Sequence, residues 1–143
     1  MTDAARQALI DGLNEDLRGE FQAVIMYRLY ASLVQGPYRQ ELRAFFAAEI
    51  PEELTHAQIL ADKLASLGAE PATTPAPVKV TRDAKEMLQT ALKAEVETLD
   101  RYIRRRKQAD EAGEYGLSVH LDDIIADETH HRDELQQMLA RWP

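Results

Sequence analysis

A Glu-x-x-His tetrapeptide occurs twice in this chain, at residues 53–56 and again at residues 128–131. In a helix, residues three apart lie on the same face, so each tetrapeptide would direct a carboxylate and an imidazole the same way. A lone glutamate precedes each tetrapeptide by 33 residues (53 − 20 and 128 − 95). The matched spacing predicts one shared site. Its six members are Glu20, Glu53, His56, Glu95, Glu128 and His131.

The spacing of apolar residues predicts that all six lie on helices. Apolar side chains recur at steps of three and four residues along the same faces as the six, which is typical of a helix with one buried face. Glycine and proline interrupt these stretches at Gly36-Pro37, in the region from Gly68 to Pro71, and near Gly113. We therefore expect a single domain over residues 1–143. Its helices should span about 3–34, 38–67, 82–111 and 116–141.

Residues 68–81 are expected to form a long crossover between the second and third helices. This stretch contains three prolines, which favour an extended chain over a helix. An extended segment of this length reaches about 45 Å, and a helix of roughly 30 residues is about as long. The crossover could therefore run the length of the bundle, and we expect Thr81 to cap the helix that follows it.

The two halves of the chain superpose at an offset of 75 residues. Glu20 then aligns with Glu95, and Tyr27 aligns with Tyr102 (95 − 20 and 102 − 27). Each lone glutamate also lies as far from its helix break as the tetrapeptide that follows the break. The pattern predicts a repeated helical hairpin with its site near a pseudo-two-fold axis.

The chemistry of the six side chains favours a pair of metal ions. Four buried carboxylates would destabilise the fold unless cations compensated their charge, and two divalent cations carry four positive charges. Carboxylate oxygen and imidazole nitrogen suit Fe or Mn, and Zn would also bind. Two bridged irons could pass two electrons to one oxidant molecule. We expect bridging carboxylates, one imidazole per metal, and terminal carboxylates: Glu53 and Glu128, His56 and His131, and Glu20 and Glu95, respectively.

Composition excludes several other classes of protein. The chain has no cysteine, so it cannot hold a disulfide, an iron–sulfur cluster, a rubredoxin-type iron site or a thiolate zinc site. A net charge of −8 argues against nucleic acid as a partner. No apolar run reaches the ~18 residues of a membrane span, and the N-terminus does not read as a signal peptide. We expect a cytoplasmic protein.

The motif set resembles the ferritin-like superfamily, and most closely its bacterioferritin branch. The resemblance extends over all four expected helices. The stretches that carry it are Leu13-Asn14-x-x-Leu17-x-x-Glu20 with Tyr27, Glu53-x-x-His56-Ala57, Glu95, and Asp127-Glu128-x-x-His131.

This resemblance implies a fold and an activity. The fold would be an all-α, ferritin-like four-helix bundle, made of two antiparallel hairpins joined by a long crossover. The activity would be that of a ferroxidase with two Fe ions per chain, which oxidises Fe(II) with dioxygen or hydrogen peroxide for iron storage or detoxification. The six residues would inherit the ligand roles, and the chain would form a homo-oligomer, either a dimer or a shell.

Four neighbouring residues refine the expectation. Leu54 stands where haem-binding bacterioferritins have methionine, so we expect no haem there. Tyr27 and Tyr102 lie seven residues after a terminal glutamate (27 − 20 and 102 − 95), and would either hydrogen-bond the ligand carboxylates or pack in the core. Glu49 would be a ligand on the path by which iron enters or on an inner surface, or else a solvated residue.

Three other functions compete with the ferroxidase. A rubrerythrin-like peroxidase could use the same centre, although without a rubredoxin domain its electrons would come from elsewhere. A four-helix interaction module could use the metal only for structure. A mini-ferritin that shields DNA fits less well, because such proteins place iron between subunits and often carry basic tails.

Overall fold

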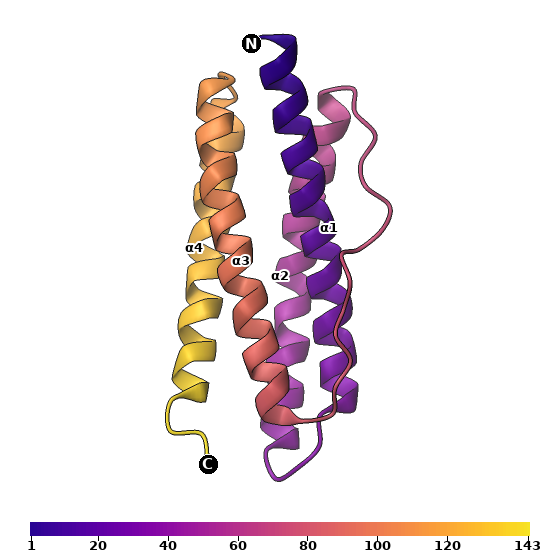
Figure 1. The fold of residues 1–143 in the computed structure, drawn as a ribbon, viewed down its shortest axis with the longest axis vertical. Coiled ribbons are helices and arrows are strands. Elements are labelled where there is room, and N and C mark those ends of the chain that lie inside the picture. The colour runs from indigo at the N-terminus through magenta and orange to yellow at the C-terminus, as the bar shows by residue number, and fades with distance from the viewer.

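The computed structural model describes residues 1–143 as four α-helices without a β-strand. Helices α1 and α2 form one antiparallel hairpin, and α3 and α4 form another. Because the connection between the hairpins runs along the bundle, the N- and C-termini lie at opposite ends (Figure 1). This arrangement confirms the predicted four-helix bundle of two hairpins. None of the helices is long and apolar enough to cross a membrane. Their bounds are α1 Asp3–Leu33, α2 Arg39–Ser66, α3 Ala84–Glu111 and α4 Tyr115–Leu139.

The start of α3 differs from the prediction. Its N-cap is Asp83, whose carboxylate accepts a hydrogen bond from the backbone N–H of Glu86 at 2.8 Å. Thr81, the predicted cap, instead accepts from the backbone N–H of Asp83 at 3.2 Å. The prediction of Thr81 was wrong because an aspartate two residues later can satisfy the first turn of the helix equally well.

Glycine ends two of the helices in the left-handed conformation. Gly68 follows α2 and Gly113 follows α3, each with φ near 74°. Such an angle strains any residue that has a Cβ, and here it lets the next residue turn back onto the helix. Ala69 donates its backbone N–H to the carbonyl of Leu64 at 2.9 Å, which closes the end of α2.

The connection between α2 and α3 first bends away from the helices and then lies along α1 down to the start of α3 (Figure 1). Gln22 of α1 donates to the carbonyl of Pro77 at 2.6 Å, and Tyr30 donates to the carbonyl of Lys79 at 2.9 Å. The backbone N–H of Ala76 in turn donates to the carbonyl of Arg18 at 3.0 Å. These bonds hold residues 76–79 of the crossover against α1.

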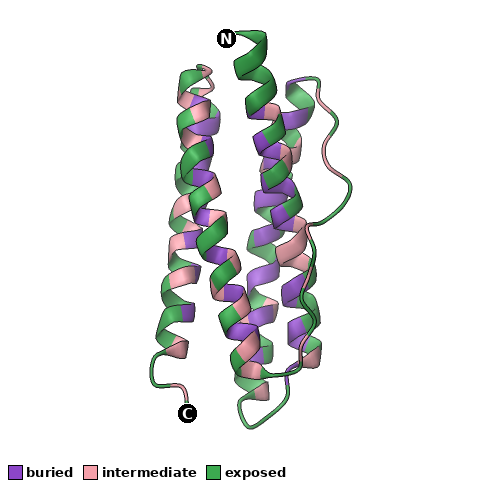
Figure 2. Ribbon diagram, viewed as in Figure 1, coloured by how far each residue is buried: buried purple, intermediate pink, exposed green.

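Buried residues recur along all four helices (Figure 2), and the apolar ones form two separate clusters. One cluster includes Leu13, near the N-terminal half of α1, and the other includes Tyr30, near its C-terminal half. Between them α1 contributes a buried carboxylate, Glu20. The bundle therefore has a polar layer across its middle, with apolar packing on both sides.

Candidate metal centre

The polar layer brings together all six side chains of the repeated pattern. Helices α1 and α3 contribute one glutamate each, and α2 and α4 contribute one Glu-x-x-His pair each. Each of the six side chains is at most 3% exposed. Their ligand atoms form two groups whose members lie within 4.8 Å of one another. The groups are Glu20, Glu53, His56 and Glu128, and Glu53, Glu95, Glu128 and His131.

Two carboxylates belong to both groups, and each imidazole belongs to one. Glu53 and Glu128 are the shared members. The Nδ1 atom of His56 lies 3.0 Å from Oε1 of Glu128, and Nδ1 of His131 lies 3.6 Å from its Oε2. Both imidazoles therefore turn the same nitrogen toward the centre, one from each side of a common carboxylate.

The outer nitrogen of each imidazole contacts a carboxylate of the opposite hairpin. Nε2 of His56 on α2 lies 3.0 Å from Asp127 on α4, and Nε2 of His131 on α4 lies 2.6 Å from Glu52 on α2. A carboxylate at this position fixes the orientation and the tautomer of a metal-binding imidazole. This role of Glu52 and Asp127 was not predicted from the sequence. The signal was present, because each directly precedes the glutamate of its tetrapeptide and the two differ by 75 positions (127 − 52).

The two tyrosines bond the two lone glutamates across the α1–α3 interface. The hydroxyl of Tyr27 on α1 donates to Oε1 of Glu95 on α3 at 2.7 Å. The hydroxyl of Tyr102 on α3 donates to Oε1 of Glu20 on α1. Both tyrosines are at most 1% exposed. The tyrosines thus hydrogen-bond two carboxylates of the cluster and also pack in the apolar core, so the two roles expected for them coexist.

Glu49 approaches the centre on one side only. It is buried on α2, and its carboxylate lies 2.9 Å from Nε2 of His131. With Glu52 and His131 it forms a third group of ligand atoms within 4.8 Å of one another. Glu49 is therefore not a solvated residue, which was one of the two alternatives for it.

Burial and mutual repulsion shift the pKa values of the carboxyls apart. Burial, together with the nearby Glu20 and Glu128, raises the pKa of Glu53 well above its ordinary value. Burial and the nearby Glu128 do the same to the pKa of Glu95. Burial also opposes the charged form of Glu128, but its contacts with Glu95 and with both imidazoles hold its pKa below the ordinary value. Glu53, Glu95 and Glu128 thus cannot all be ionised unless cations lie beside them.

For the two imidazoles, burial and the nearby carboxylates shift the pKa in opposite directions. Burial would lower the pKa of His56, but the carboxylates of Glu128 and Glu20 outweigh burial and raise this pKa to about 11. The same competition between burial and nearby carboxylates, with Glu128 and Glu49 foremost, raises the pKa of His131. Without metal, protons therefore supply the positive charge that the carboxylates require.

Unpaired polar atoms are concentrated at this centre. Among buried side-chain nitrogen and oxygen atoms without a hydrogen-bond partner, all but Nε of Arg101 belong to the cluster or to Glu49. They include both carboxylate oxygens of Glu128 and the Nδ1 atoms of the two imidazoles. Buried polar atoms are normally paired, and a set of unpaired ones that converge from four helices is what a metal-binding cavity presents. The residues present thus fit a pair of divalent cations.

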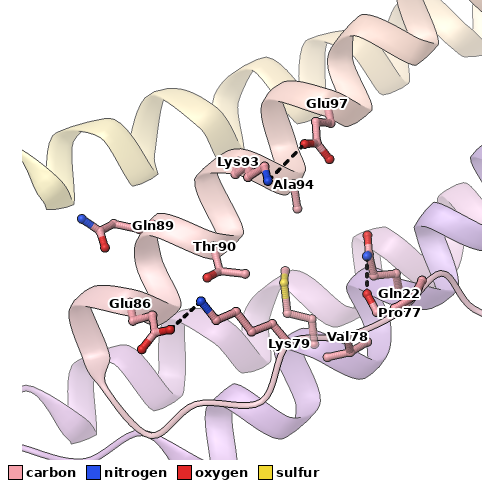
Figure 3. Close-up of a pocket in the computed structure, with 11 residues that line it drawn as sticks. Gln22, Pro77, Val78, Lys79, Glu86, Gln89, Thr90, Lys93, Ala94 and Glu97 are labelled. Atoms are coloured by element: carbon pink, nitrogen blue, oxygen red, sulfur yellow. Dashed lines mark hydrogen bonds and ion pairs between the residues drawn. The ribbon is translucent and has the colours of Figure 1, made fainter.

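Two residues that adjoin the cluster in the sequence lie outside the centre. His130 is exposed, although it neighbours His131. Leu54 is also exposed on α2, at 52%. The surface pocket between the crossover and α3 is lined by Lys79, Glu86 and other residues, none of which belongs to the cluster (Figure 3).

Comparison with known proteins agrees with this geometry. A family model described as Ferritin, Ferritin-like domain, matches residues 10–143. A bacterioferritin of Streptomyces coelicolor is 32% identical over 92% of this chain and 79% of that protein. A bacterioferritin of Brucella melitensis is 30% identical over 92% of this chain and 82% of that protein.

Solved structures are similar over nearly the full chain. The crystal structure of a ferritin-like, diiron-carboxylate protein from Bacillus anthracis superposes with a TM-score of 0.93. It is 47% identical and covers 97% of this chain and 99% of its own. A Dps protein from Bacillus brevis, 23% identical with a TM-score of 0.89 over 97% and 99% of the two chains, shares the fold. The family match, the bacterioferritin relatives and the shared bundle together show that this chain belongs to the ferritin-like family.

Proposed function

We propose that this protein binds two Fe(II) ions per chain in the polar layer and oxidises them with dioxygen or hydrogen peroxide. One observation carries the proposal. Two groups of buried ligand atoms, each with one imidazole nitrogen, share the carboxylates of Glu53 and Glu128. Shared carboxylates are what hold two cations beside each other. The relatives named bacterioferritin and the diiron-carboxylate protein of Bacillus anthracis support iron as the cargo.

Each ligand has a distinct role in the proposal. Glu53 and Glu128 bridge the two metal positions, and Glu20 and Glu95 are terminal carboxylates, one for each position. His56 and His131 supply one nitrogen each through Nδ1. Asp127 and Glu52 hold the outer imidazole nitrogens, so that the rings keep this orientation.

The chemistry requires two electrons and two protons for each oxidant molecule. Two Fe(II) ions supply two electrons, and dioxygen that takes up two electrons and two protons becomes hydrogen peroxide. Hydrogen peroxide that takes up the same number becomes two water molecules. Burial and the neighbouring carboxylates raise the pKa of Glu53 and of Glu95, which favours protons on these carboxyls when no metal is bound. Metal binding should displace these protons, because the ligands act in their deprotonated form.

Anaerobic titration of metal-free protein with Fe(II), followed by exposure to oxidant, tests the proposal. We expect saturation at two irons per chain and rapid oxidation by dioxygen or peroxide. Glu128→Ala removes a shared ligand and should abolish stoichiometric binding. Glu134→Ala is the matched control, because Glu134 is exposed on the same helix.

The same titration separates the alternatives. Faster turnover with hydrogen peroxide than with dioxygen would favour a peroxidase. Uptake beyond two irons per chain would support storage in a homo-oligomeric shell, whereas saturation at two would support a dimer or another assembly without a store. Absence of stoichiometric iron binding in the wild-type protein would refute the proposed centre.

A further inference from the structure

The two halves of the centre are related by the 75-residue repeat, and the structure reproduces the relationship in its contacts. The Tyr27–Glu95 bond corresponds to the Tyr102–Glu20 bond, as 27 + 75 = 102 and 95 − 75 = 20. Around this symmetric frame, the buried charged side chains fail to repeat at two places. Each failure lies on a helix one turn before a ligand, and each involves charge.

The first failure is at Glu49, four residues before Glu53. Its counterpart in the other half is Ile124 (49 + 75), four residues before Glu128. Glu49 is 8% exposed and lies 2.9 Å from Nε2 of His131, whereas Ile124 is an apolar core residue. The imidazole of His131 therefore has two carboxylates at its outer nitrogen, and that of His56 has only Asp127 there.

The second failure is at Asp16, four residues before Glu20. Arg105 of α3 donates from Nε to its carboxylate at 2.7 Å, and Nε of Arg101 lies 3.6 Å away. The counterparts of these three residues are Ala91, Tyr30 and Met26 (16 + 75, 105 − 75 and 101 − 75). All three counterparts are buried in one apolar cluster. An ionic contact thus replaces an apolar one at the same place in the repeat.

Gly12 and Gly19 of α1 leave the space that the two arginine side chains occupy. A Cβ at Gly12 would overlap the guanidinium of Arg105, and a Cβ at Gly19 would overlap that of Arg101. Gly19 directly precedes the ligand Glu20, so the Arg101 guanidinium rests on the backbone beside that ligand. The buried pair of Asp16 and Arg105 is neutral as a pair, and the guanidinium of Arg101 adds a positive charge beside Glu20. Arg101 also borders a surface pocket that holds the carboxylates of Glu15, Glu97 and Asp100. Glu49 adds one negative charge next to the Glu95 position.

From this asymmetry, we propose that the two metal positions are unequal and that the position formed by Glu95 and His131 fills before the one formed by Glu20 and His56. The inference rests on the proposed function, because it concerns the same centre. A divalent cation is attracted by the extra carboxylate on one side and repelled by the extra guanidinium on the other. In the partly desolvated interior, this charge difference should make the first binding step at least about tenfold tighter than the second.

Binding of Mn²⁺ to the whole metal-free protein tests the proposal without turnover. Calorimetry should resolve two steps whose affinities differ at least about tenfold. Crystals grown with one equivalent of Mn²⁺ per chain should give the larger anomalous peak beside Glu95 and His131. The same crystals with excess Mn²⁺ should show both positions filled.

Two variants should reduce the difference in affinity between the first and second Mn²⁺ binding steps, one by weakening the first step and one by strengthening the second. Glu49→Gln removes the extra carboxylate and should weaken the first step several-fold without changing the second. Arg101→Met installs the residue found at the equivalent place of the other half, and should strengthen the second step without changing the first. Arg104→Met is the control, because Arg104 is exposed on the same helix and should change neither step.

The outcomes are distinct. Equal anomalous peaks at one equivalent, or a larger peak beside Glu20 and His56, would overturn the inference and leave the proposed function intact. A first Mn²⁺ bound only between Glu49, Glu52 and Nε2 of His131 would also overturn it. If neither central position bound Mn²⁺ or Fe(II), the proposed function itself would fail.

Discussion

The hydroxyl of Tyr27 lies 2.7 Å from the carboxylate of Glu95, at the end of a phenol ring that is fully buried between two helices. This bond crosses from α1 to α3 and so joins the two hairpins at the level of the metal centre. It also holds one oxygen of Glu95, which leaves the other oxygen without a partner in the protein. In the proposed centre, the tyrosine would therefore orient Glu95 as a terminal carboxylate for a cation.

Tyr27→Phe should lower the affinity for the metal at the Glu95 position while the fold remains intact. The ring still fills its space, but Glu95 loses the bond that orients it, and loss of such a contact costs about 10- to 100-fold in metal affinity or activity. Calorimetric titration with Mn²⁺ and initial rates of Fe(II) oxidation provide the measurement. Tyr30→Phe is the control, since the Tyr30 hydroxyl bonds the crossover at Lys79 instead of the centre. Equal losses in both variants would contradict this role of Tyr27.

Asp127→Ala should weaken metal binding although Asp127 is not a proposed ligand. The change removes the acceptor for Nε2 of His56, so the ring is free to rotate and to exchange tautomers. We expect a decrease of about 10- to 100-fold in the affinity for Mn²⁺. Asp123→Ala, at an exposed position on the same helix, provides the comparison. If Asp127→Ala bound Mn²⁺ as tightly as Asp123→Ala, the outer carboxylate would have no part in holding the imidazole.

The stability of the metal-free protein should fall as pH rises. The folded state raises the pKa of Glu53 and Glu95 above 4.5 and that of His56 from 6.5 to about 11. Above the ordinary pKa values, the unfolded chain has released protons that the folded chain retains. The contribution of the two carboxyls to the stability of the fold is thus lost from pH 4.5 upward. The contribution of His56 is lost between pH 6.5 and about pH 11. Each such proton lowers the free energy of unfolding by about 1.4 kcal/mol per pH unit.

Urea unfolding with chelator present, measured in steps from about pH 5 to about pH 8.5, tests this trend. The lowered pKa of Glu128 acts in the other direction, but only below pH 4.5, so it leaves this range unaffected. Glu95→Gln cannot ionise and should give a shallower slope than the wild-type protein. With saturating Mn²⁺ the decline should disappear, because the cation replaces the protons. An unfolding free energy that rises over this range would contradict the predicted protonation.

The ion pair of Asp16 and Arg105 should be costly to break from one side. Arg105→Met leaves the carboxylate of Asp16, at 1% exposure, without its main partner, and loss of one member of a buried pair costs about 3–5 kcal/mol. The double variant Asp16→Ala with Arg105→Met should recover most of this loss, because the opposite half has apolar residues at the equivalent place. Urea unfolding of the single and double variants provides the measurement, with Arg104→Met as the exposed control. A double variant no more stable than Arg105→Met would refute this account.

The sequence predicts that the six side chains converge because two short-range spacings determine their positions, one within a helix and one across a turn. Each Glu-x-x-His pair is fixed by the helical repeat, and each lone glutamate is placed level with its pair by the Gly36 and Gly113 turns. The four-helix architecture followed from the same periodicity. Helix ends were less certain, as the cap of α3 shows, because Thr81 and Asp83 are both competent acceptors and only the path of the crossover decides between them.

Contacts between distant positions were not predictable in the same way. Asp16 and Arg105 are 89 residues apart, and in sequence each looks like a solvated charge on a helix. Their pairing depends on how far α3 is rotated toward α1 and on the space that Gly12 leaves open. Neither quantity is encoded in a local pattern, so this buried ion pair was found only from the structure.

The crossover that lies along α1 has a consequence for how such a centre can change over time. A hairpin that paired with an identical copy of itself would give a two-fold centre in which every substitution appears twice. When one covalent segment joins the two hairpins, as after duplication and fusion of a gene, a substitution in one hairpin no longer has to appear in the other. Glu49 can then differ from Ile124, and Asp16 from Ala91, while the shared ligands stay matched. Linkage into one chain is thus what allows each half of the centre to evolve independently.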